Sequence, residues 1–145
     1  MRQGRKEQFG FTLIEILIVV VILGFLASTV GPELFNKVSQ AERTSARNQI
    51  DVFKTALDNY RLDNRHYPST EQGLQALIKN PRSAPKAANW NGPYLEKKEI
   101  PLDPWGNEYQ YQCPGKHNSH KYDLWSQGAD NTDGGTGKGA DVTNW

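Results

Sequence analysis

Near its start the chain reads Gly10-Phe-Thr-Leu-Ile-Glu-Ile-Leu-Ile-Val-Val-Val-Ile-Leu-Gly-Phe-Leu-Ala-Ser-Thr-Val-Gly-Pro32, a run whose only charged residue is Glu15. As a helix rising ~1.5 Å per residue, residues 11–32 would extend about 33 Å and could cross a hydrocarbon core about 30 Å thick. Three of the first six residues are basic. Positive charge before a membrane span predicts a cytoplasmic N-terminus and export of the remainder of the chain.

The remainder of the chain is polar by comparison. Of the 145 residues 37% are apolar, and 17 of those lie between positions 11 and 35. The four Trp, six Tyr and five Phe can still form a small core, so one modest domain is expected after the apolar run. The net charge of +1 gives no basic face that would indicate a nucleic-acid partner. Cys113 is the only cysteine, so no intrachain disulfide can close the loops of this domain.

Glu15 is unusual, because a carboxylate inside an apolar span is costly and usually has a partner. It lies four residues after Phe11, so a cut between Gly10 and Phe11 would place a new amino group one helical turn away. A pair formed between neighbouring helices would fix their axial register, since any other stagger leaves both charges unpaired. The position of Glu15 therefore indicates ordered assembly of many copies.

A helical pattern continues beyond the apolar run. Apolar residues recur three to five positions apart, at Ala41, Ala46, Ile50, Phe53, Leu57 and Tyr60. This spacing predicts one apolar stripe on an amphipathic helix that ends near residue 62. The pair Gly31-Pro32 predicts a kink or melted turn near residues 31–33, because proline removes a helical hydrogen bond.

A small mixed domain is expected after the helix. The sequence Ser69-Thr-Glu-Gln72 resembles a capping box and predicts a short helix over about 71–79. Residues 108–113 and 121–126 alternate like half-buried strands, and residues 114–120 would join them as an antiparallel hairpin. The apolar face of this small sheet is expected to lie on the amphipathic helix.

Three stretches match known motifs: Gly10-Phe-Thr-Leu-Ile-Glu15 after a basic leader, Tyr67-Pro-Ser-Thr-Glu-Gln-Gly-Leu-Gln-Ala-Leu77, and Asp103-Pro-Trp-Gly-Asn-Glu-Tyr-Gln-Tyr111. The first resembles the class III signal of type IV pilins and of type II secretion pseudopilins. The other two resemble one branch of that superfamily, the major pseudopilins of the type II secretion system. Including the final Ala-Asp-Val-Thr-Asn-Trp145, the resemblance extends from Gly10 to the last residue.

The resemblance implies an α+β, type IV pilin-like fold, with a long N-terminal helix packed on a small antiparallel sheet. Residues 1–10 would be a leader, 11–33 a transmembrane or filament-core helix, and 34–62 the amphipathic part of the same helix. Residues 63–145 would form a periplasmic globular domain. A prepilin peptidase would cleave between Gly10 and Phe11, and Phe11 would be N-methylated.

The resemblance also implies a structural role rather than an enzymatic one. The subunit would be anchored in the bacterial inner membrane and would then polymerise into a helical, periplasmic homo-oligomer, the pseudopilus, with Phe11 and Glu15 guiding assembly. Minor pseudopilins and the inner-membrane secretion platform would be partners. The outer-membrane secretin channel and the exported proteins would be contacted indirectly.

The last loop, residues 127–145, suits a calcium ion. It holds five of the thirteen glycines together with Asp130, Asp133 and Asp141. Glycine lets backbone carbonyls converge, and Asp supplies the hard oxygen ligands that Ca²⁺ prefers. The EF-hand template fails here, and a solvated polar tail is the alternative. A terminal Trp145 favours a fixed loop, because burial of its ring requires one.

Calcium in this loop is also implied by the resemblance. Carried over by position, Asp130 and Asp141 would give side-chain oxygens, and Gln127 and Thr132 would give main-chain carbonyls. Some relatives carry a second Asp just before the last one, and this chain does not. A carbonyl, a water or Asp133 must replace that ligand. A bound metal could restrict the loop in place of the absent disulfide.

Two other functions remain as alternatives. A type IV pilin-like subunit could serve adhesion or DNA uptake, and a membrane-anchored periplasmic enzyme or binding domain would not polymerise. No nucleophile elbow, phosphate loop or dinucleotide motif is present in the sequence. Cys113, His117 and His120 have a spacing that suggests zinc, but no fourth ligand is evident.

Overall fold

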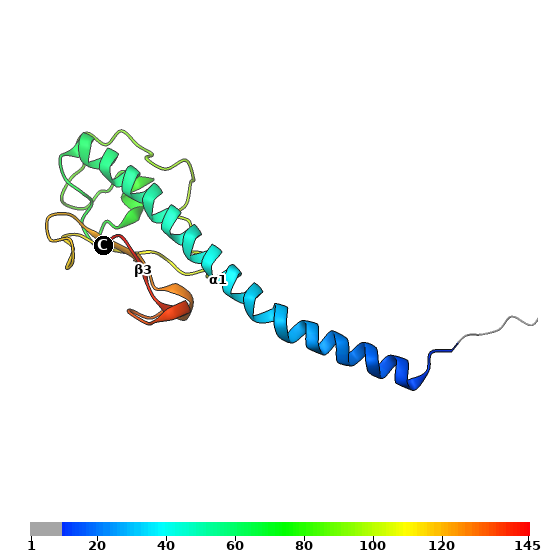
Figure 1. Ribbon diagram of the computed structural model, residues 1–145. Coiled ribbons are helices and arrows are strands. Elements are labelled where there is room, and N and C mark those ends of the chain that lie inside the picture. The colour runs from blue at the N-terminus through cyan, green and yellow to red at the C-terminus, as the bar shows by residue number, and fades with distance from the viewer. Residues whose placement is uncertain (1–9) are drawn as a thin grey trace, which may run out of the picture. The chain divides into compact units, whose positions relative to one another are not determined.

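The computed structural model describes residues 10–145, apart from the side chains of residues 30–32. Its elements are α1 (Leu13–Asn64), the 3-10 helix η1 (Leu74–Leu77), β1 (Gln110–Gln112), β2 (Asp123–Ser126), the 3-10 helices η2 (Gly128–Asp130) and η3 (Gly137–Gly139), and β3 (Val142–Thr143) (Figure 1). The α+β prediction is confirmed. Two compact units, Met1–Val38 and Ser39–Trp145, divide the chain, and α1 contributes to both. The predicted leader lies outside the described residues except for Gly10.

The first unit, where described, is a helix without a core of its own. Leu13 is 85% exposed and Val19 50% exposed, although both are strongly apolar. By length and composition α1 can span a membrane. The helix is continuous through residues 31–33, so the melted turn expected there was wrong, and the alternative of a kink stays a prediction. Proline removes one backbone donor, and the hydrogen bonds of the flanking residues are enough to keep the helical path.

The second unit is built on the apolar stripe of α1. Five stripe residues are at most 1% exposed, namely Ala46, Ile50, Phe53, Leu57 and Tyr60. Ala41 is exposed, so the stripe begins about one turn later than predicted. The ring of Phe53 meets that of Tyr109 edge-on, with 5.2 Å between centroids. Aromatic pairs of this kind add to the free energy gained by burial of their apolar area.

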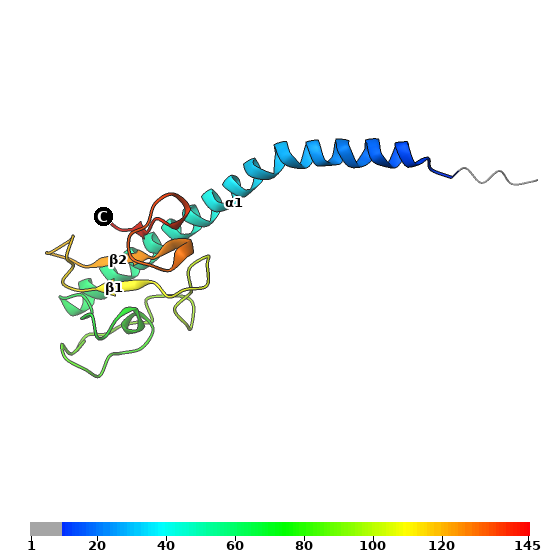
Figure 2. The same ribbon diagram turned by 90° about the horizontal axis from the view of Figure 1, so that it is seen from below.

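The sheet lies along the second-unit part of α1 (Figure 2). Its strand order is β1-β2-β3, and both pairs are antiparallel. β1 and β2 confirm the predicted hairpin, with Tyr111 opposite Leu124. β3 was not predicted, because two residues are too few to show an alternating pattern. Leu124 and Val142 are buried in the same core as α1.

The capping box forms as predicted, but the helix that follows it is short. The backbone N–H of Gln72 donates to Ser69 Oγ at 3.2 Å, and the backbone N–H of Ser69 donates to Gln72 Oε1 at 3.0 Å. Gly73 has φ +56°, a left-handed conformation that an α-helix does not allow. The segment therefore continues as the four-residue η1 and not as an α-helix over 71–79.

Asp123 organises the hairpin between β1 and β2. Its carboxylate is buried and accepts backbone N–H groups from His117 at 2.8 Å and from Asn118 at 2.9 Å. The His117 ring lies 3.2 Å from the same carboxylate. Burial raises the pKa of Asp123, but the hydrogen bonds from the hairpin backbone and His117 outweigh it and hold the pKa below its usual value.

We expect Asp123→Asn to remove a pH-dependent part of the stability. A carboxyl with a lowered pKa stabilises the fold above its ordinary pKa of about 3.9, and this contribution is lost as the pH falls through the native value. The free energy of unfolding of the variant should be about 1–3 kcal/mol lower at pH 7, because the Asn amide places an N–H donor where the backbone also offers N–H donors. Urea unfolding at pH 7 and near pH 2 measures this, and the gap between the two proteins should narrow in acid.

The matched control is Asp51→Asn, which changes an exposed carboxylate paired with Lys54. Exposed pairs contribute little, so its stability should stay within about 0.5 kcal/mol of the parent. If Asp123→Asn lowers the free energy of unfolding by the same amount at both pH values, the lowered pKa assigned to Asp123 would be contradicted.

Candidate functional site

The predicted processing site lies at the start of the described chain. Gly10 and Phe11 precede α1 and are exposed, so the peptide bond between them is in non-helical, accessible chain. Thr12 caps the helix, because its Oγ1 accepts the backbone N–H of Glu15 at 3.3 Å. The side chain of Glu15 is also exposed in the isolated subunit. Such an arrangement leaves both the cleavage point and the carboxylate open to other molecules.

The C-terminal loop places Asp130 and Asp141 close to one Gly-Gly segment. The backbone N–H of Gly134 donates to Asp141 Oδ2 at 2.9 Å, and the N–H of Asp141 returns to the carbonyl of Gly134 at 3.1 Å. A Cβ atom built on Gly135 would lie 3.0 Å from Asp130 Oδ2 and would collide with the carbonyl oxygen of Gly139. Glycine is therefore needed where the backbone, the Gly139 carbonyl and the Asp130 carboxylate approach each other.

This geometry fits a calcium ion through one unsatisfied atom. Asp141 Oδ1 is buried and has no hydrogen-bond partner among the described residues. A buried carboxylate oxygen without a donor is costly, and a cation would compensate for it. Within residues 10–145 no three His, Cys, Asp or Glu side chains gather closely enough to hold a metal ion. Backbone carbonyls and water would have to complete a calcium shell.

The other three predicted ligands are placed differently. Asp133 Oδ1 accepts the side-chain amide of Gln127 at 2.9 Å and the indole N–H of Trp125 at 3.2 Å. These two hydrogen bonds, that of Gln127 first, lower the pKa of Asp133. Thr132 donates its backbone N–H to Asp130 Oδ1 at 3.2 Å. All five residues, Gln127, Asp130, Thr132, Asp133 and Asp141, therefore stay predicted ligands.

Trp145 differs from the sequence expectation. Its ring stacks on that of His117 with 4.0 Å between centroids and 7° between planes, yet the residue is 46% exposed. The neighbouring Val142 is 1% exposed. The loop is therefore fixed by Val142 in β3, and the terminal Trp145 is only half covered.

Two charged residues of α1 that the sequence reasoning missed hold loops in place. The indole N–H of Trp105 donates to Glu42 Oε2 at 3.1 Å, and the Arg43 guanidinium donates to the carbonyl oxygens of Ala140 and Asp141. Both side chains are half-buried. Both residues lie beside the apolar stripe and not on the opposite face of the helix, and this position could have indicated that they contact other parts of the domain.

A buried aspartate secures the entry to the same loop. Asp103 Oδ2 accepts the hydroxyl of Ser126 at 2.6 Å, and Ser126 Oγ accepts the backbone N–H of Gly128 at 3.2 Å. Asp103 is 5% exposed, and its Oδ1 also caps the turn that contains Trp105. The sequence pattern did not predict that this turn anchors the C-terminal loop.

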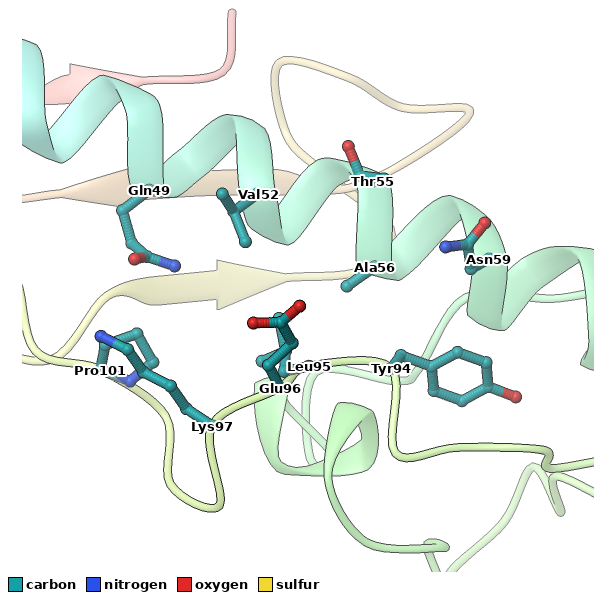
Figure 3. A pocket seen from close by; sticks show the side chains of 10 residues that line it. All are labelled: Gln49, Val52, Thr55, Ala56, Asn59, Tyr94, Leu95, Glu96, Lys97 and Pro101. Atoms are coloured by element: carbon teal, nitrogen blue, oxygen red, sulfur yellow. The ribbon is translucent and has the colours of Figure 1, made fainter.

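A groove of about 480 Å³ lies between α1 and the loop that follows Tyr94 (Figure 3). Val52 and Ala56 of the helix line it opposite Leu95 and Glu96 of the loop. Its lining includes Thr55, Glu96 and Lys97, but the Thr55 hydroxyl donates to the carbonyl of Asp51 at 3.1 Å, not to either of these two side chains.

Family models account for nearly the whole chain. The model for the prokaryotic N-terminal methylation motif matches residues 5–31, and the model for the type II secretion system (T2SS), protein G, matches residues 33–145. The chain belongs to the protein G family of the type II secretion system. This membership makes it a structural pseudopilin of that system and not an enzyme.

Relatives and a solved structure agree with the assignment. Type II secretion system core protein G of Pseudomonas aeruginosa is 51% identical over 97% of both chains. The protein of the same name from Vibrio cholerae is 47% identical over 100% of this chain and 96% of its own length. The crystal structure of the major pseudopilin from the type 2 secretion system of enterohaemorrhagic Escherichia coli matches this chain with a TM-score of 0.66 and 36% identity. The match covers 79% of this chain and 95% of that chain.

Proposed function

We propose that this pseudopilin polymerises through its apolar helix into a periplasmic filament that drives folded proteins out across the outer membrane. The observation that carries the proposal is the exposed apolar surface of α1 between Leu13 and Leu26. This surface belongs to the first unit, whereas the buried apolar residues of the described chain all belong to the second unit. A surface of that size is stable in lipid before assembly and against identical helices afterwards. Membership of the type II secretion family favours this function over adhesion or DNA uptake.

Before assembly, the subunit would be anchored in the inner membrane with its N-terminus in the cytoplasm. The basic residues that precede the span support this orientation. Prepilin peptidase, minor pseudopilins and the inner-membrane secretion platform would be direct partners. The secretin channel and the exported proteins would be reached through the filament.

We expect the mature chain to start at methylated Phe11. Gly10→Val should leave the leader attached, because a branched side chain replaces hydrogen at the cleaved bond, and unprocessed subunits should form no filaments. N-terminal sequencing and mass determination of the membrane-extracted protein measure both changes. Gly4→Val, a substitution of the same type in the leader, should be processed normally. A wild-type chain that starts at Met1 or beyond residue 28 would contradict the proposed processing.

A calcium ion in the C-terminal loop is the second part of the proposal. The Asp141 Oδ1 atom, which has no partner in the described part of the chain, supports it, as do the Asp130 carboxylate and the glycine backbone of the loop. When bound, calcium would supply the positive charge that these oxygens lack. Asp130 and Asp141 would hold the ion, and the loop residues between them would lose freedom that glycine otherwise provides.

A further inference from the structure

Arg43 connects α1 to the end of the C-terminal loop across most of the sequence. Its guanidinium donates to the carbonyl oxygen of Ala140 through Nη1 and to that of Asp141 through Nη2, the latter at 3.4 Å. The side chain is half-buried, and both partners are backbone atoms. Arg43 therefore holds two consecutive peptide groups with one planar fork, which a lysine cannot do.

These two peptide groups lie on either side of the Cα atom of Asp141, whose Oδ1 has no donor among the described residues. The main chain of Asp141 is fixed by Arg43 on its carbonyl side and by Gly134 on its N–H side. Its Oδ2 accepts the Gly134 N–H, whereas the buried Oδ1 has no partner within residues 10–145. The contact of Arg43 thus fixes the residue whose orientation matters most for a cation.

The loop needs such a fixed point because its backbone is unusually free. Gly134, Gly135 and Gly137 all have positive φ values, and Gly139 follows them. Glycine loses more conformational freedom on ordering than any other residue. A side chain that orders part of the loop in advance reduces what a bound ion must order, and so raises affinity.

We propose that Arg43 is a positioning residue for the cation loop, and that it presents the Asp141 carboxylate to calcium by holding the Ala140 and Asp141 carbonyls. The inference rests on the proposed calcium site. Its consequence is that calcium occupancy and the Arg43 contact stabilise each other, since each orders what the other binds. The positive charge of the Arg43 guanidinium repels a calcium ion in the loop. The hydrogen bonds that the guanidinium donates to the two carbonyl oxygens partly offset this repulsion.

Calcium titration of the full, detergent-solubilised chain tests this. We expect Arg43→Ala to raise the calcium Kd about tenfold or more, as is typical when a residue that orients metal ligands is removed. The calcium Kd of Arg43→Lys should lie between those of the wild-type chain and of Arg43→Ala, because lysine keeps the positive charge but not the planar fork. Arg47→Ala is the matched control, since Arg47 is an exposed arginine one turn further along α1, and its Kd should be unchanged.

A second measurement separates positioning from ordinary stabilisation. The melting temperature of each variant is compared in calcium and in EDTA, alone and combined with Asp130→Ala. A positioning role predicts that Arg43→Ala reduces the calcium-dependent rise in melting temperature, and that this reduction vanishes in the Asp130→Ala background. If Arg43→Ala does not fold, Arg43→Lys decides the question by the same titration.

The outcomes distinguish this inference from the calcium site itself. A wild-type chain that binds calcium, with Arg43→Ala binding it equally or more tightly, would overturn the role of Arg43 and leave the site intact. A wild-type chain that does not bind calcium would overturn both. If Arg43→Ala lowers the melting temperature equally in calcium and in EDTA and leaves the calcium Kd unchanged, Arg43 stabilises the fold and does not position the site.

Discussion

Replacement of Glu15 by alanine is expected to abolish pseudopilus formation while leaving the second unit folded. Cleavage after Gly10 would create an ammonium group on Phe11, and in the filament that group would lie among apolar helices. Removal of one partner of a buried ion pair typically costs about 3–5 kcal/mol, because the other charge stays buried and unpaired. At each subunit contact this corresponds to roughly two to four orders of magnitude in association constant. Electron microscopy after overexpression, together with N-terminal sequencing, measures assembly and processing.

Glu33→Ala is the matched control, because it removes an exposed glutamate of the same helix that pairs with Lys37 at 3.1 Å. Exposed pairs contribute little, so fibres should form at the wild-type level. Normal processing of Glu15→Ala would show that the defect lies in assembly. Wild-type numbers of fibres from Glu15→Ala would exclude the register mechanism.

The parts of the fold that follow from periodicity were predictable. Apolar residues recur at the period of a helix in the stripe from Ala46 to Tyr60, and at the period of a strand in the hairpin of β1 and β2. The elements that were wrong or missed depend on single residues. Gly73 in a left-handed conformation shortens the helix after the capping box, and β3 exists only because β2 offers it an edge. Local propensity carries no signal for either.

The candidate site was predictable by composition but not by contacts. Acidic residues and glycines marked the loop, and the structure places Asp130 and Asp141 around Gly134 and Gly135. The residue that holds the loop to the helix, Arg43, is nearly a hundred positions away from it. Such a contact depends on the tertiary fold, so spacing along the sequence could not reveal it.

Removal of calcium should lower the melting temperature of the chain strongly. A ligand present at about a hundred times its Kd stabilises the native state by about 2.7 kcal/mol, and a domain of this kind shifts by roughly 4–8 °C for each kcal/mol. EDTA should therefore lower the transition by about 10–20 °C. Without calcium, the Asp141 Oδ1 atom stays buried without a donor, and the glycine backbone between residues 134 and 139 regains its freedom. Differential scanning calorimetry in calcium and in EDTA measures the shift.

Asp130→Ala should remove the response to EDTA, since it deletes one of the two carboxylates that the structure places at Gly134 and Gly135. Asp133→Ala provides the sharper comparison, because its Oδ1 already accepts hydrogen bonds from Trp125 and Gln127. If Asp133 is not a ligand, this variant keeps the calcium-dependent shift and loses only a few tenths to about 1 kcal/mol of stability from those bonds. Loss of the shift in both variants would make Asp133 a ligand. An unchanged melting temperature of the wild-type chain on chelation would exclude calcium from the loop, and the Asp141 carboxylate would then need another partner.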